Sequence, residues 1–125
     1  MLDNFHMFES KDSSYVALQG YLNRTTVIVR VNSSAIDDLD QFGGAPTQEQ
    51  RTAFARHNSG AIRAIAQTKI ERDEAEPESW VGRDALAVRI NGADFAEYLS
   101  QPAHRLSYAA FDPRAQVKWG RDGRF

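Results

Sequence analysis

Alternating β-branched residues dominate residues 25–31, where valine recurs at every second position. This period of two predicts a half-buried strand. Residues 14–22 predict a second strand, and Asn23 and Arg24 between the two favour a tight hairpin turn, because Asn tolerates a positive φ angle. The chain is therefore expected to build an antiparallel sheet from this hairpin.

A second periodic stretch, residues 47–72, predicts one long helix of roughly 25 residues. Thr47 and Gln50 have the spacing of a capping box, in which each side chain bonds the backbone N–H of the other residue. Gly60 in the middle costs about 1 kcal/mol relative to alanine, so it predicts either close packing or a kink.

The expected fold class is α+β: an antiparallel sheet of about three to five strands packed on one long helix, with smaller helices. A third strand is expected at residues 85–91, and the smaller helices at residues 33–42 and 93–99. Residues 1–13 predict either a short edge strand or a loose segment. The acidic run Glu71–Glu78 contains Pro77 and predicts a solvated loop.

The 125 residues fit one domain of ordinary size. We expect residues 1–100 to form that α+β domain. Residues 101–125 form a basic, aromatic-containing extension that either belongs to the domain or follows it. Whether this extension is a hairpin, a helix or a loose tail stays open.

The absence of cysteine excludes disulfide scaffolds, cysteine nucleophiles and cysteine-ligated metal sites. The first seven residues carry neither a basic residue nor a long apolar run, so no secretory signal is expected. The chain also has no apolar run of about 18 residues, the length that spans a membrane. A cytoplasmic protein is therefore expected, with no membrane partner.

The order strand–strand–helix–long helix–strand, over about residues 14–96, resembles the uncharacterised bacterial domain of unknown function 1488 family. The segments that carry the resemblance are Thr26–Val31, Ser33–Ile36, Phe54–His57 with Ile62, Ala66 and Ile70, Leu86–Ile90, and Asp94-Phe95. The resemblance implies a small bacterial α+β protein and no known activity, cofactor or catalytic residue. This chain departs from the family pattern by about 25 additional C-terminal residues.

No catalytic, metal-binding or cofactor-binding residue is predicted. The three histidines, His6, His57 and His104, are too far apart in sequence to share a helix face. His57, on the long helix, is expected at the edge of the core with one hydrogen bond. A cleft joining His57 or His104 to Asp94 or Glu97 would support an enzyme, since acid–base chemistry needs groups within hydrogen-bond reach.

Gly60, Ala61 and Ala64 place small side chains on one face of the long helix. Small residues let backbones approach closely. This face is expected either to pack on the sheet of the same chain or to form the helix crossing of a homodimer, the commonest assembly. Our hypothesis is a homodimer with an interface at these residues.

The extension holds five basic and two acidic residues, interleaved with aromatic side chains. Cations neutralise phosphates and aromatic rings stack on unpaired bases, so this pattern indicates a possible nucleic-acid contact. The residues assigned to it are Arg114, Lys118, Trp119, Arg121 and Arg124. In the alternative, the aromatic side chains dock on the domain and the arginines only keep this segment solvated.

Three function classes follow. The first is an uncharacterised non-catalytic binding or regulatory module that acts through protein contacts, as a homo-oligomer or with an unidentified protein partner. The second is a nucleic-acid-binding accessory protein that uses its basic extension. The third is an enzyme whose site cannot be read from the sequence; catalysis is the least expected of the three because no catalytic constellation is present.

Overall fold

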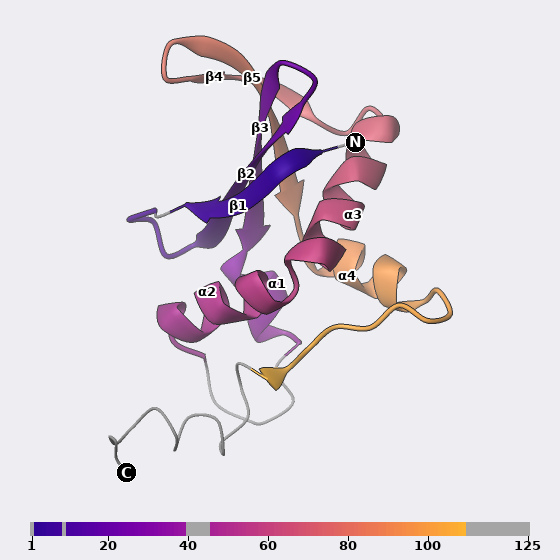
Figure 1. Cartoon of the computed structure of the whole chain (residues 1–125). Helices are drawn as coiled ribbons and strands as arrows, with labels where there is room; N and C mark the ends of the chain where they lie inside the picture. The colour runs from indigo at the N-terminus through magenta and orange to yellow at the C-terminus, as the bar shows by residue number, and fades with distance from the viewer. Residues whose placement is uncertain (1, 9, 40–45, 110–125) are drawn as a thin grey trace.

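The computed structural model describes residues 2–8, 10–39 and 46–109. Within them lie five strands and four helices, which confirms the mixed α+β class (Figure 1). In chain order the elements are β1 (Asp3–Phe8), β2 (Tyr15–Leu22), β3 (Thr25–Asn32), α1 (Ser33–Asp37), α2 (Gln48–His57), α3 (Ser59–Glu71), β4 (Glu76–Trp80), β5 (Arg83–Ile90) and α4 (Gly92–Leu99). None of these helices is long and apolar enough to cross a membrane.

The five strands form one sheet in the order β1-β2-β3-β5-β4. Three neighbouring pairs are antiparallel, but β3 and β5 run parallel. The expectation of an antiparallel sheet was therefore wrong. The reason lies in the connection: the chain leaves the end of β3, passes through α1, α2, α3 and β4, and returns in the same direction, which is the long crossover that a parallel pair requires.

The predicted hairpin of β2 and β3 is confirmed. Its register runs from Tyr15 opposite Asn32 to Leu22 opposite Thr25, and Asn23 in the turn has a φ angle of 59°. On one face, Val and Leu side chains of the two strands pair and are buried. The period of two along the sequence thus placed the core face of these strands correctly.

Part of the predicted acidic loop is instead the edge strand β4, which pairs with β5. Pro77 cannot donate a ladder hydrogen bond, and an edge position tolerates such a residue. Acidic side chains and a proline also discourage another chain from pairing with this edge. At the opposite edge, β1 is the short strand that residues 1–13 allowed, with an irregular register between Asp3 and His6.

The single long helix was wrong, because α2 and α3 are separate helices that meet at Asn58. The capping box at the start of α2 is confirmed, with both Thr47–Gln50 hydrogen bonds present. Asn58 has φ −113° and ψ 24°, outside helical values. Its side-chain amide donates to the carbonyl oxygens of Phe54 and Ser107, each at 2.9 Å, and its Oδ1 accepts from the Ser107 N–H at 2.6 Å.

The break therefore lies two residues before Gly60, where a kink had been considered, and it depends on a contact with a distant segment. Of the smaller helices, α4 agrees with the prediction and begins with a capping box of Asn91 and Asp94. The helix α1 ends at Asp37 rather than near residue 42, and residues 40–45 lie outside the described residues.

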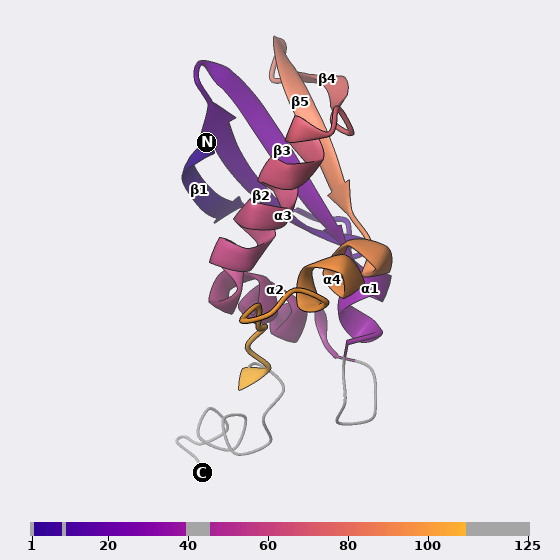
Figure 2. The ribbon, with the colours of Figure 1, turned by 90° about the vertical axis from the view of Figure 1, so that its right-hand side faces the viewer.

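The helices of the described residues cover only one face of the sheet. Figure 2 shows α3 lying across one face, while α1, α2 and α4 gather at the end of the sheet where β3 and β5 finish. The main core fills the space between the sheet and these helices. Phe54 of α2 and Phe95 of α4 are fully buried in it and meet edge to face, with ring centroids 6.2 Å apart. Leu106 and Tyr108 pack against the same core.

On the other face of the sheet, which we call the open face, no described helix is present (Figures 1 and 2). Phe8 and Trp80 come from the two edge strands and meet edge to face, with ring centroids 5.3 Å apart. Strand alternation puts Ile28 on this face too, yet it is fully buried. The right-handed twist of a sheet raises opposite corners toward each other, which explains the contact between Phe8 and Trp80.

Candidate functional site

The predicted nucleic-acid contacts, Arg114, Lys118, Trp119, Arg121 and Arg124, lie outside the described residues, so this prediction stays a prediction. The beginning of the extension does lie on the domain. Leu106 is 8% exposed, Ser107 bonds Asn58, and the Tyr108 ring lies 6.2 Å from the Phe54 ring. A truncation that tests the tail must therefore keep residues up to Ala109.

The small-residue face of α3 packs within its own chain only in part, because Ala61 contacts the core while its two neighbours face solvent. Gly60 and Ala64 are exposed and Ala61 is half-buried. The core side of α3 is formed by Ile62, Ile65 and Ala66 instead. A Cβ atom added at Gly60 would meet nothing within 4 Å, so close packing within the chain does not explain this glycine. The homodimer interface at these residues stays a prediction.

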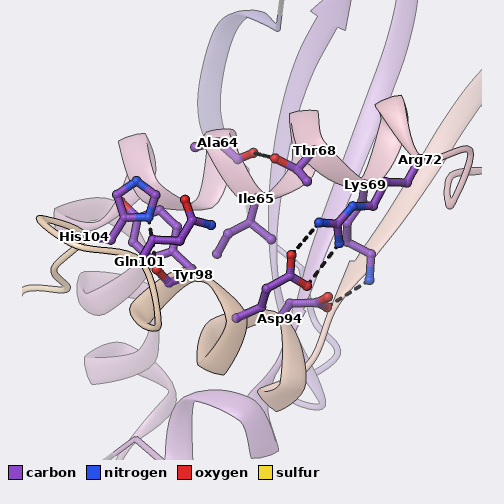
Figure 3. Close-up of a pocket in the computed structure, with 10 residues that line it drawn as sticks. Ala64, Ile65, Thr68, Lys69, Arg72, Asp94, Tyr98, Gln101 and His104 are labelled. Carbon is purple, nitrogen blue, oxygen red and sulfur yellow. Dashed lines mark hydrogen bonds and ion pairs between the residues drawn. The ribbon is translucent and has the colours of Figure 1, made fainter.

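A pocket between α3 and α4, the α3–α4 pocket, brings together the groups that would support an enzyme (Figure 3). Its volume is about 90 Å³. Asp94, Glu97 and His104 all line it, next to Lys69 and Arg72. His57 is elsewhere, exposed at the C-terminal end of α2, so its expected place at the core edge was wrong.

The Lys69–Asp94 ion pair in this pocket holds three elements together. Lys69 Nζ lies 2.8 Å from Asp94 Oδ2 and donates to the Arg89 carbonyl oxygen, also at 2.8 Å. Asp94 Oδ2 further accepts from the Asn91 N–H at 2.9 Å, which is half of the α4 capping box. The carboxylate is thus committed to fixing the start of α4 against α3 and β5, and its role is structural.

The second ion pair of the pocket, Arg72 with Glu97, is bidentate, with N–O distances of 3.0 and 2.6 Å. The hydrogen bonds from Arg72 hold the pKa of Glu97 below its ordinary value and raise the pKa of Arg72. A carboxylate with a lowered pKa stays ionised near neutral pH and is a weak general base. In this structure the Glu97 carboxylate is engaged by the Arg72 guanidinium.

His104 is held in the same region by Tyr98. The two rings are stacked, with centroids 4.1 Å apart, and His104 Nδ1 lies 3.0 Å from the Tyr98 carbonyl oxygen. These contacts fix the loop that follows α4. Ligand pockets usually enclose about 300–1,000 Å³. The α3–α4 pocket, at about 90 Å³, lies below this range, and its two acids are already paired.

A larger hollow, the β1–α2 groove, lies between the ends of β1 and β2 and the helix α2. Its volume is about 660 Å³, within the range of ligand sites. The three α2 residues that line the groove are four positions apart in sequence, so they lie on one face of the helix. The described residues that line it are Met7, Phe8, Ser10, Lys11, Tyr15, Val16, Ala17, Gln48, Thr52 and Arg56.

The charge of this groove is positive. Lys11 and Arg56 are both exposed, and no described residue forms an ion pair with either of them. The described lining contains no aspartate or glutamate. The chain as a whole has a net charge of −2, so this positive groove runs against the overall charge. Two unpaired cations beside an apolar floor favour an anionic ligand.

Behind Tyr15 the open face adds two more guanidinium groups. The Cζ atoms of Arg30 and Arg89 lie 5.5 and 5.8 Å from the centre of the Tyr15 ring. Glu78 neutralises Arg30 through two hydrogen bonds of 2.9 and 2.7 Å, which hold the pKa of Glu78 below its ordinary value. Arg89 bonds the amide oxygen of Asn32 rather than a carboxylate. Arg89 also lies close enough to the carboxylates of Glu78 and Asp12 to lower the pKa of both.

Sequence reasoning missed the β1–α2 groove. Its one visible signal is the row of polar residues Gln48, Thr52 and Arg56 at steps of four along α2, which is also the pattern of an ordinary solvated helix face. Lys11 lies in a loop with no periodic pattern. Within residues 2–8, 10–39 and 46–109, no three acidic or histidine side chains gather as a metal site.

Comparison with known proteins assigns no family to this chain. No protein-family model, no curated protein and no solved structure matches it. The resemblance to the domain of unknown function 1488 family thus stays a prediction, and the geometry of the described residues carries the functional argument.

Proposed function

We propose that the protein is a non-catalytic binding module that acts through protein contacts, with the β1–α2 groove as its contact site. The observation that carries this proposal is the groove itself: about 660 Å³, a floor of apolar side chains, and two exposed cations without an acidic partner among the described residues. Binding sites combine an apolar surface with a few polar groups that fix orientation, and this groove has that composition.

The contrast with the α3–α4 pocket supports binding over catalysis. There the acids are bonded to Lys69 and Arg72, and one of them completes a helix cap. A catalytic acid or base exchanges a proton with a substrate, so a carboxylate already bonded within the chain must first give up that contact. In the groove, by contrast, the described charged side chains are uncompensated and accessible, so they can contact a partner without breaking an internal bond.

The experiment is selection from a displayed library of random 12-residue peptides on the full chain, followed by titration of the recovered peptides. We expect dissociation constants in the micromolar range, and amide NMR signals of groove residues such as Ser10, Lys11 and Thr52 should shift. The variant Thr52→Trp fills the groove and should abolish binding. The control His57→Trp places the same side chain on an exposed position of α2 outside the groove and should leave binding unchanged.

Peptides that shift only signals of the α3–α4 pocket, or that bind both variants equally, would show that the groove is not the contact site. Selection that yields no peptide binding below about 1 mM would contradict the protein-binding function itself.

A further inference from the structure

We propose that the ligand of the β1–α2 groove is an acidic peptide segment that inserts one apolar side chain between two carboxylate-bearing neighbours. This inference rests on the proposed binding function and names the chemistry of the partner. Its basis is the arrangement of charge, apolar surface and ring contacts around the groove.

Charge complementarity selects an anion. Lys11 comes from the loop after β1 and Arg56 from the last turn of α2, so the two cations reach the groove from different elements. Both are exposed and neither has a carboxylate partner among the described residues. Carboxylates placed beside them would form ion pairs that these two cations do not make with any described residue, and such pairs speed association and set specificity.

The apolar part of the groove selects the side chain between the carboxylates. Met7 and Phe8 of β1 are half-buried, while Val16 and Ala17 of β2 are buried beneath the surface. Along α2 the groove extends from Gln48 to Arg56, which is about 12 Å at 1.5 Å per residue. An extended peptide covers that length with about four residues. One leucine or phenylalanine flanked by glutamates matches this length and composition.

The ring contacts disfavour nucleic acid as the ligand of this groove. Single-stranded nucleic acids bind through bases that stack on free aromatic faces. Phe8 already makes an edge-to-face contact with Trp80, and the Tyr15 ring has the guanidinium groups of Arg30 and Arg89 beside it. The groove thus offers a cationic apolar surface without a free stacking platform, which suits a peptide better than a base.

The test uses fluorescence anisotropy with four labelled probes and the full chain. The first probe is a pentapeptide with two glutamates on each side of a central leucine. In the second, glutamine replaces every glutamate, and in the third, alanine replaces the central leucine. The fourth is a twelve-nucleotide oligothymidine. The first peptide should bind, and the second and third should each bind at least about fivefold more weakly.

Two variants of equal net charge separate the groove from general electrostatics. The double variant Lys11→Gln/Arg56→Gln neutralises both groove cations. The control Arg24→Gln/Arg63→Gln removes two exposed cations that do not line the groove. Exposed ion pairs each change affinity by up to about fivefold, so the groove variant should weaken the acidic peptide about tenfold and the control less than twofold. All four sites are exposed, and unchanged melting temperatures verify folding.

Equal binding of the glutamate and glutamine peptides, or equal loss in both variants, overturns the inference. If neutral peptides from the library occupy the groove while the acidic peptide does not bind, the binding function stands and the acidic ligand is wrong. If no peptide binds, both the protein-binding function and the acidic ligand are wrong. Oligothymidine that binds more tightly than the acidic peptide and is lost in the groove variant would replace the peptide with nucleic acid.

Discussion

The side chain of Asn58 should stabilise the fold more than any other polar group at the α2–α3 junction. It is 5% exposed and makes three hydrogen bonds, one to Phe54 within α2 and two to Ser107. The side-chain amide of Asn58 donates to the carbonyl oxygen of Ser107 and accepts from its N–H, as the backbone of a neighbouring strand does in a sheet. The change Asn58→Ala removes all three bonds at once.

The magnitude follows from the surroundings of each partner. A hydrogen bond contributes about 1 kcal/mol net, so three bonds set an upper value of roughly 3 kcal/mol. Ser107 is exposed, so water can replace part of its loss, and the Phe54 carbonyl oxygen keeps the backbone N–H of Asn58 as a donor. Alanine also favours a helix more than asparagine does. We therefore expect a loss of about 2 kcal/mol in the free energy of unfolding.

Urea denaturation of the full chain measures this loss, with His57→Ala as the control at the exposed neighbouring position. Native-state hydrogen exchange should report the same event locally, because the Ser107 amide loses its acceptor and should exchange faster. A loss below about 0.5 kcal/mol together with unchanged exchange at Ser107 would refute the assigned role of Asn58.

Three further outcomes are expected. Gly60→Ala should stabilise the monomer by about 0.5 kcal/mol in thermal melts, since Gly60 lies in the first turn of α3 and a Cβ there meets nothing within 4 Å; light scattering that shows a dimer weakened by this methyl group would instead support the homodimer interface. Val81→Asn should raise the free energy of unfolding by about 1 kcal/mol, and with it the melting temperature, because Val81 is 85% exposed with φ 52°, a conformation that asparagine tolerates. A lower melting temperature would contradict this. Glu78→Gln should lower stability at neutral pH, and the difference from the unaltered chain should shrink as the pH falls below about 4.5, because Arg30 depresses the folded-state pKa of Glu78 and protonation removes the pair; a difference independent of pH between 7 and 2 would exclude this assignment.

Much of the local structure could be predicted because its causes lie within a few residues of sequence. The β2–β3 hairpin follows from alternating valines and a turn at Asn23, and the start of α2 follows from the Thr47–Gln50 capping box. The helix α4 follows from its apolar spacing after Asn91. In each case the hydrogen bonds and the buried face are determined by neighbours along the chain.

The features that sequence reasoning missed all depend on distant contacts. At the α2–α3 break the Asn58 side chain bonds Ser107, which is 49 residues away along the chain. The acidic segment becomes β4 only because β5 supplies the hydrogen-bonding partners that the segment lacks alone. No local pattern encodes such partners, so helix period and loop composition gave the wrong result at these places.

The candidate site shows the same division. His104, Asp94 and Glu97 could be singled out as chemically capable residues, but only the structure shows Lys69 and Arg72 paired with the two acids. The β1–α2 groove joins a loop, two strand ends and one helix face, and none of these is distinctive by itself.

By itself, then, the sequence determined the α+β class, the central hairpin and the capping box of α2, because backbone geometry and short-range hydrogen bonds set them. The tertiary structure decided the parallel pairing of β3 with β5, the division of the long helix, the solvent-facing side of α3 and the positive groove. These depend on which surfaces are buried against each other, and burial is a property of the whole packed chain.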